Sequence, residues 1–243
     1  MKTINIALLL GFILSTSLLQ AQWSNEKIKG NGKIVQKNIT TSSYESIQVA
    51  GAFKVLLTHG KVGDIQIKAE ENLLQHIIVE TDGNTLKIRA EKNKNLQPSS
   101  GKKMEILVPI ETLKKISLAG SGDIISEKII ENDKINIQLA GSGDIKVQIQ
   151  SDEVDIKLSG SGDITVKGTT KKLAAQVAGS GDIHAQDLLA EEAHVKVAGS
   201  GDIKVQATEF LEARVAGSGD IRYQGKPKKL DVKTAGSGTI KSF

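Results

Sequence analysis

The sequence predicts an all-β protein: a parallel β-helix, or β-solenoid, with coils of about 19 residues and an irregular N-terminal β cap. The pentapeptide Gly-Ser-Gly-Asp-Ile occurs six times, and a seventh copy reads Gly-Ser-Gly-Thr-Ile. Successive first glycines lie 21, 19, 19, 20, 18 and 19 residues apart, which fits one solenoid coil per repeat. Between the motifs, apolar and polar residues alternate, as in strands with one buried face. The first glycines are Gly120, Gly141, Gly160, Gly179, Gly199, Gly217 and Gly236.

Each motif is predicted to form a bend followed by a buried strand. Gly-x-Gly between extended segments favours a corner with positive φ or close packing, since both are easiest without a Cβ. Equivalent residues of a parallel solenoid stack about 4.8 Å apart. The isoleucine of every motif should therefore join one buried ladder, each side chain contributing about 1.5–3 kcal/mol. This structural ladder comprises Ile124, Ile145, Ile164, Ile183, Ile203, Ile221 and Ile240.

Residues 22–115 are rich in predicted strands but lack the repeat, and we assign them to the cap of a solenoid that spans residues 116–243. Residues 49–55 look like a degraded copy of the motif. Asp82-Gly83-Asn84 predicts a hairpin between strands at 77–80 and 86–90. We expect a short helical turn at Leu73–His76, and a polar loop at 91–103 before a strand at 104–108.

Residues 1–21 have the features of a secretory signal peptide. Lys2 precedes an apolar run from Ile6 to Leu14, and small and polar residues follow as far as Ala21. We therefore expect an exported protein that is periplasmic, on the outer surface or secreted, with an uncleaved membrane anchor as the alternative. No later segment is predicted to span a membrane. The chain has no cysteine, so export brings no disulfides.

The composition argues against a nucleic-acid partner. Lys2 is one of 32 basic residues, so a chain cleaved after Ala21 keeps 31 against 28 acidic residues, and the two signs are interspersed. Aromatic residues make up only 3% of the chain, which offers no stacking platform for bases or sugars.

The aspartates of the motif are the one column with testable chemistry. Stacked carboxylates repel, so something must offset their charge. Calcium is one interpretation, because oxygen-rich turns of other β-rolls bind it, although they use a nonapeptide repeat. We favour a structural interpretation without metal or cofactor, in which turn amides and basic residues two positions beyond balance the carboxylates. The column is Asp123, Asp144, Asp163, Asp182, Asp202 and Asp220, with Lys146, His184, Lys204, Arg222 and Lys241 as basic neighbours.

The sequence does not predict an enzyme. Polysaccharide-cleaving β-helices carry long loops that wall a groove, whereas these coils are of near-minimal length. A motif repeated along a whole solenoid builds a scaffold, while a catalytic site is a single constellation. The serines lie in Gly-Ser-Gly-Asp bends rather than in a nucleophile elbow, and the histidines show no metal-ligand spacing. The histidines are His59, His76, His184 and His194.

Several motifs together resemble a known bacterial family. They are the signal peptide, the segment Ser46–Val55 (SIQVAGAFKV), the hairpin strand Leu86-Lys87-Ile88 and the tandem Gly-Ser-Gly-Asp-Ile coils. In this order they resemble the head GIN domain family, labelled as autotransporter adhesins, over residues 40–240. The resemblance implies a β-helix-like fold in exported proteins common among Bacteroidetes, and it brings no catalytic residues. The chain ends with its last coil, so we expect no translocator barrel.

The functional prediction is a non-catalytic cell-envelope protein that acts as an adhesin-like binding module. Its expected partner is a surface protein or glycan, of identity unknown from the sequence. The alternatives are a self-associating envelope scaffold, and a calcium-stabilised or glycan-binding protein. Self-association would use the open C-terminal coil; a frayed last coil shielded by Lys233 and Lys241 is the interpretation that we favour.

Overall fold

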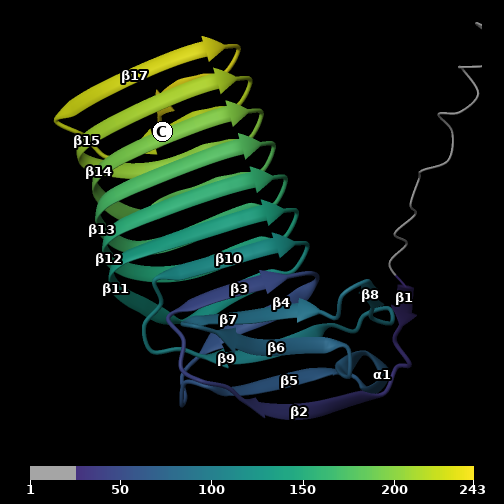
Figure 1. Cartoon of the computed structure of the whole chain (residues 1–243). Coiled ribbons are helices and arrows are strands. Elements are labelled where there is room, and N and C mark those ends of the chain that lie inside the picture. The colour runs from purple at the N-terminus through teal and green to yellow at the C-terminus, as the bar shows by residue number, and fades with distance from the viewer. Residues whose placement is uncertain (1–25) are drawn as a thin grey trace, which may run out of the picture.

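Parallel strands stacked into a solenoid dominate the computed structural model, which describes residues 26–243. The predicted signal peptide at 1–21 lies outside the described residues. The predicted all-β solenoid is confirmed, with about seven turns and coils of about 19 residues (Figure 1). Its strands are β10 (Lys115–Gly120), β11 (Asp123–Gly141), β12 (Asp144–Gly160), β13 (Asp163–Gly179), β14 (Ile183–Gly199), β15 (Ile203–Gly217), β16 (Ile221–Gln224), β17 (Lys229–Gly236) and β18 (Ile240–Ser242).

Each coil has two faces and two corners. The sharp corner is the Gly-Ser-Gly motif, and the long strand that follows bends near its middle before it reaches the next motif. At this second corner Ser151 and Thr170 are buried, and their hydroxyls donate to the carbonyls of Glu153 and Lys172, both at 3.1 Å. These bonds satisfy polar groups where the strand changes direction. We call the part of a coil before this corner the first half, and the part after it the second half.

Bulges absorb the unequal coil lengths. The first coil, from Gly120 to Gly141, is two residues longer than the next, and its register with β12 shifts between Ile125 and Ile129. A second shift lies opposite Thr165 and Lys167, where β14 belongs to a coil of 20 residues. Because the register shifts lie in the first half or at the second corner, every second half stays in register.

The cap continues the ladder and then closes it. Strand β3 stacks in parallel under β10, β4 under β11, and β7 and β9 form the next rung. Below them β6 and β5 run antiparallel to this rung, and β2 is antiparallel to β5. The bounds are β1 (Glu26–Lys29), β2 (Ile34–Thr40), β3 (Ser46–Ala50), β4 (Phe53–Thr58), β5 (Asp64–Glu70), α1 (Glu71–Leu74), β6 (Ile77–Asp82), β7 (Thr85–Ala90), β8 (Lys94–Gln97) and β9 (Met104–Pro109).

Most local predictions in the cap are confirmed. The degraded motif at 49–55 stacks on the first coil, with Val49 opposite Leu118 and Val55 opposite Ile124. The hairpin forms as β6 and β7, and the helical turn forms as α1, two residues earlier than expected. The expected boundary between residues 115 and 116 falls inside β10, which pairs with both β3 and β11.

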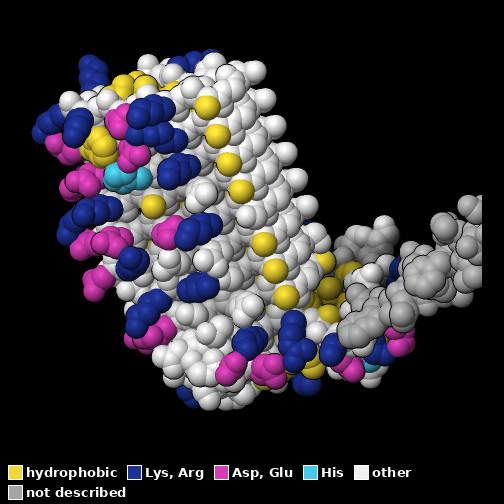
Figure 2. Space-filling view, turned by 45° about the horizontal axis from the view of Figure 1, so that its top comes forward, with side chains coloured by type: hydrophobic (Ala, Val, Ile, Leu, Met, Phe, Trp, Pro, Cys, Tyr) yellow, Lys and Arg dark blue, Asp and Glu magenta, His cyan; other side chains and the backbone are white. Residues whose placement is uncertain are grey.

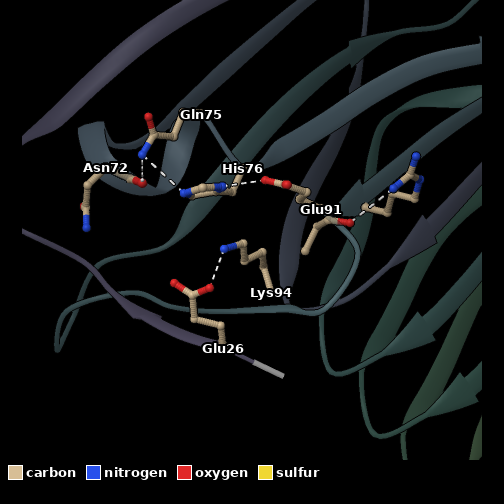
Figure 3. A network of polar contacts seen from close by, with 8 residues as sticks. Glu26, Asn72, Gln75, His76, Glu91 and Lys94 are labelled. Carbon is tan, nitrogen blue, oxygen red and sulfur yellow. Dashed lines mark hydrogen bonds and ion pairs between the residues drawn. The ribbon is translucent and has the colours of Figure 1, made fainter. Parts of the chain in front are cut away.

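The prediction of a polar loop at 91–103 is wrong in part, because this segment contains β8, which pairs in parallel with β1. Figure 3 shows the polar network around this pair. Lys94 Nζ lies 2.5 Å from Glu26 Oε2, and His76 Nδ1 lies 2.7 Å from Glu91 Oε2. The hydrogen bond from His76 holds the pKa of Glu91 below its usual value. The polar side chains suggested a loop, but here they are the contacts that attach two short strands.

Candidate functional site

The glycines of the motif have separate structural reasons. Gly179, the first glycine of its motif, has φ of 134°, a conformation that favours glycine. Gly181, the second, is needed for a close approach, because a Cβ there would lie 2.0 Å from the carbonyl oxygen of Gly162 on the preceding coil. The same approach recurs along the stack. The repeated motif is thus explained by backbone stacking.

The isoleucines predicted to form a ladder lie in one continuous register, each opposite its equivalent on the next coil. All are fully buried except Ile240 in the last coil, which is half-buried. The column continues into the cap through Val55 and Ile106. These side chains are core and cannot meet a ligand.

The aspartates are half-buried at the sharp corner, and most are used by the backbone of the next coil. Asp163 Oδ1 accepts the N–H of Asp182 at 3.0 Å, and Asp182 and Asp202 in turn accept at 2.8 Å. Asp220 ends the series by accepting both the N–H and the hydroxyl of Thr239. These bonds hold the pKa of Asp220 below its usual value, with smaller contributions from Lys241 and Arg222.

Basic side chains lie near three of the aspartates. Lys146 Nζ is 3.4 Å from Asp144, an Arg222 nitrogen is 3.8 Å from Asp220, and Lys103 from the cap is 3.8 Å from Asp123. Within residues 26–243, no three His, Asp or Glu side chains are grouped so as to hold a metal ion. The arrangement therefore offers inter-coil hydrogen bonds and cations where the calcium interpretation would need converging ligands.

A different surface of the solenoid carries a row of small side chains. The second half of each coil ends in a small exposed residue just before the first glycine, and these residues stack in one row that continues to the half-buried Ala50 of the cap. Figure 2 shows the row as yellow spots, interrupted once by the serine, with dark-blue cationic side chains beside it. The row is Ala50, Ala119, Ala140, Ser159, Ala178, Ala198, Ala216 and Ala235.

Two residues before each alanine stands a longer side chain, so the row is a floor with one raised side. Two hollows of about 470 and 640 Å³ lie over this row, one toward the cap and one toward the last coil. A third hollow, of about 320 Å³, lies on the opposite flank of the raised side, with which it shares Lys157, Gln176 and Lys196. We call the row together with its raised side the axial trough. Its raised side is Ser117, Gln138, Lys157, Gln176, Lys196, Arg214 and Lys233.

The trough is basic along this side, which carries four cations and no carboxylate. Arg214 is held in place by Glu212 at 3.2 Å and Asp231 at 2.5 Å, and its guanidinium lowers the pKa of Asp231. Lys157 lies 3.4 Å from Asp155. Lys196 and Lys233 make no ion pair with any residue in the described part of the chain.

Another hollow, of about 670 Å³, lies outside the second corner. Its lining includes Glu131, Asp133, Asp152 and Glu191. Lys171 from the same lining pairs with Asp152 at 2.9 Å, so a cation of the chain itself already sits among these carboxylates. We assign this hollow no ligand.

Sequence reasoning singled out the motif residues and missed the trough. Aligning the coils on their first glycine would have shown the signal: position −1 is always alanine or serine, and position −3 is always basic, amide or hydroxyl. Alternation alone marked these residues only as polar-face positions.

A solenoid with an open, basic trough along its axis defines a class of repeat proteins that present an extended surface to a partner. Within that class, the chain belongs to the family described as "Putative auto-transporter adhesin, head GIN domain", whose model matches residues 43–227. The resemblance predicted from the sequence is therefore confirmed.

Solved structures of similar proteins support the assignment. A "putative adhesin" from Bacteroides fragilis is 30% identical, with a TM-score of 0.83 over 89% of this chain and 100% of that chain. A "Putative lipid binding protein" from Parabacteroides distasonis is also 30% identical, with a TM-score of 0.75 over 90% of this chain and 100% of that one. A "putative adhesin" from the latter species shares the fold at 24% identity, with a TM-score of 0.70 over 90% and 100% of the two chains.

None of the curated proteins is significantly similar to this chain. Within residues 26–243, no helix is both long and apolar enough to cross a membrane.

Proposed function

We propose that this protein is an exported, non-catalytic binding module of the adhesin type, and that it binds its partner in the axial trough. The observation that carries the proposal is the unbroken register of the row and its raised side across the second halves of the coils, since adhesion to a long partner needs an extended surface. The names of the family and of its solved members as adhesins support it. The role of the motif residues in stacking the coils also supports the proposal, because it accounts for these residues without a catalytic function.

Steric blocking of the trough tests the proposal. Ala198→Trp would place a large side chain on the exposed floor between Lys196 and the corner. Lys204→Trp is the matched control, because Lys204 lies on the first half of the next coil, on the other face. Both variants and the parent would be applied to arrays of glycans, matrix proteins and lipids. The expected result is that Ala198→Trp alone loses the signals of the parent, and equal retention by both variants would refute trough binding.

Exposure on the outer surface of the cell is tested on intact cells. Protease added outside should degrade this protein, while a periplasmic control protein survives. Degradation keeps the adhesin proposal, whereas protection would contradict it and favour a periplasmic scaffold. The cells must express the protein with its own residues 1–21, because export is predicted from the signal peptide in this segment.

A self-associating scaffold is the second candidate, and the last coil favours it. Leu230 and Val232 of β17 keep 46% and 42% of their surface exposed, because no described strand stacks beyond them. A second copy stacked there would cover apolar side chains and an open strand edge. Light scattering over a concentration series should then show a rising mass that Val232→Lys abolishes, and a constant monomer mass would exclude this candidate.

A further inference from the structure

We propose that the axial trough binds an extended anionic polysaccharide with one carboxylate or sulfate for about every second sugar ring, lying along the solenoid axis. This inference rests on the proposed function and names the partner class of the same surface. It follows from the order of side chains on the raised side of the trough.

The lysines of the trough stand on alternate coils. Lys157, Lys196 and Lys233 belong to β12, β14 and β17, and one strand lies between each pair in the stack. With about 4.8 Å between neighbouring strands, successive lysines are about 9.6 Å apart, close to the length of two sugar rings in an extended glycan. A polymer charged at every second ring would therefore keep its register with the lysines along the trough.

The intervening coils present groups of another kind. Gln176 offers an amide, which can bond to sugar hydroxyls. Arg214 is already engaged by Glu212 and Asp231, and its guanidinium is therefore less available to a ligand anion. Of the three lysines, Lys196 and Lys233 lack any ion-pair partner within residues 26–243, and Lys157 keeps more than half of its side chain exposed.

The floor suits sugar rings. Alanine methyl groups form a flat, weakly apolar strip, so the faces of pyranose rings can lie on it without meeting a bulky side chain. On the opposite flank of the raised side, Ala174 opens a smaller hollow, because it stands between Asp155 and His194 where neighbouring coils carry longer side chains. The carboxylates of Asp155 and Glu212 line this same hollow and can accept from hydroxyls.

Two other polyanions fit less well. A nucleic acid is charged at every nucleotide and gains much of its affinity from base stacking, whereas the trough has lysines on alternate coils and no Phe, Tyr or Trp in the lining of its hollows. An anionic membrane is a plane, and a recessed floor would keep the alanines from reaching it. Both are outcomes of the test below.

The test measures binding of hyaluronan octasaccharides, which carry one carboxylate for every two rings, to the whole folded protein. The trough variant replaces Lys157, Lys196 and Lys233 by Gln, the residue already at positions 138 and 176 of the same side. The matched control replaces Lys146, Lys204 and Lys241 by Gln, which removes the same charge from the other face. Dextran, single-stranded oligothymidine and vesicles of phosphatidylglycerol are the comparison ligands.

We expect the trough variant to weaken hyaluronan binding by about tenfold or more, as three exposed ion pairs would, and the control to change it by about twofold or less. Salt should weaken the parent's binding, and dextran should not bind. An equal loss in both variants would mean diffuse attraction and would overturn the inference. Tighter binding of oligothymidine or vesicles than of hyaluronan would also overturn it.

The array experiment separates this inference from the proposed function. If Ala198→Trp abolishes binding to a neutral glycan or a protein, the trough is a binding site and only the anionic-polysaccharide inference fails. If Ala198→Trp leaves every interaction intact, both fail.

Discussion

The carboxylate of Asp182 accepts a hydrogen bond of 2.8 Å from the backbone N–H of Asp202, its equivalent on the next coil. The side chain of one motif thus binds the backbone of the next motif, and the aspartate column connects coils as the sheet hydrogen bonds do. Carboxylates that receive N–H donors are stabilised in their charged form, which offsets their mutual repulsion. This explains how the corner tolerates a stack of like charges.

The first prediction concerns this acceptor. Asp182→Ala should destabilise the protein by about 1–2 kcal/mol, because the N–H of Asp202 loses its partner at a half-buried corner. Asp182→Asn keeps an oxygen at the same place and should cost about 0.5 kcal/mol or less. Urea unfolding measures both. A chelator should leave the melting temperature unchanged, and a large drop on chelation, or a severe Asp182→Asn effect, would restore the calcium interpretation.

The second prediction concerns the ladder. Ile183 is fully buried between Ile164 and Ile203, so Ile183→Asn should destabilise the protein by about 3 kcal/mol or more, or prevent folding, since it buries an unsatisfied amide. Ile183→Val removes one methylene and should cost about 0.5–1.5 kcal/mol. Denaturant midpoints give both values. Similar midpoints for the Asn and Val variants would show that this position is not core.

The third prediction concerns the close approach of the coils. Gly181→Ala places a Cβ 2.0 Å from the oxygen of Gly162, and the corner must open to relieve the clash. We expect a loss of about 1–3 kcal/mol or more, as for an overpacked core. Ala178→Ser is the control three residues away, because it changes an exposed side chain. If both variants melt at the same temperature, the second glycine does not serve stacking.

The fourth prediction concerns Glu70, which is only 1% exposed in the cap. Its carboxylate accepts from the hydroxyl and N–H of Ser99 at 2.6 and 2.8 Å and from the N–H of Gly32 at 2.5 Å. The Ser99 hydroxyl contributes most to a lowered pKa. A carboxyl whose pKa is lowered by folding stabilises the folded protein at pH values above its unfolded-state pKa. This stabilisation is lost as the pH falls through the pKa of the folded state.

Glu70→Gln should therefore lower the melting temperature at neutral pH and lower it less at about pH 3, below the unfolded-state pKa of about 4.3, where the stability given by the charge is being lost. Glu71→Gln is the neighbouring control, because Glu71 is exposed and pairs only with Lys33 at the surface. An equal effect of Glu70→Gln at both pH values would contradict the assigned role of the charge.

The fifth prediction concerns Tyr44, whose hydroxyl donates a 2.6 Å hydrogen bond to the carbonyl of Pro109. Burial raises the pKa of Tyr44 to about 12. The stability gained from the neutral phenol is therefore complete below about pH 10 and is lost as pH rises through about 12. Tyr44→Phe should cost about 1 kcal/mol at neutral pH and flatten the alkaline loss of stability. Tyr223→Phe serves as the control, and an unchanged alkaline profile in Tyr44→Phe would refute the prediction.

The repeat made much of the fold predictable. Glycines equivalent to Gly179 and Gly181 occur in every motif and predict a corner. The alternation of apolar and polar residues through Val177 and Ile183 shows which face is buried. These are local signals, because strand periodicity and backbone conformation depend on neighbours in the chain. The segment around β8 was mistaken for a loop, since its partner β1 lies about 68 residues earlier and polar contacts replace an apolar pattern.

The candidate site was less predictable than the fold. In the cap, the carboxylate of Glu70 likewise accepts from Ser99 and Gly32, which lie 29 and 38 positions away in the sequence, and no spacing rule predicts these contacts. The trough depends on Lys157, Lys196 and Lys233 lying on one line, although bulges between coils could have shifted any of them. The register is set by the whole stack, in which the bulges fall in the first half of a coil or at its second corner and leave the second half undisturbed.

The sequence by itself determined the solenoid, its coil length and its buried face, because these follow from periodicity and from glycine at each corner. Only the tertiary structure decided where the aspartates send their hydrogen bonds, how the cap closes the ladder and which polar side chains form a trough. Those features are contacts between residues about 18 to 70 positions apart, and they exist only once parallel strands have stacked in one register.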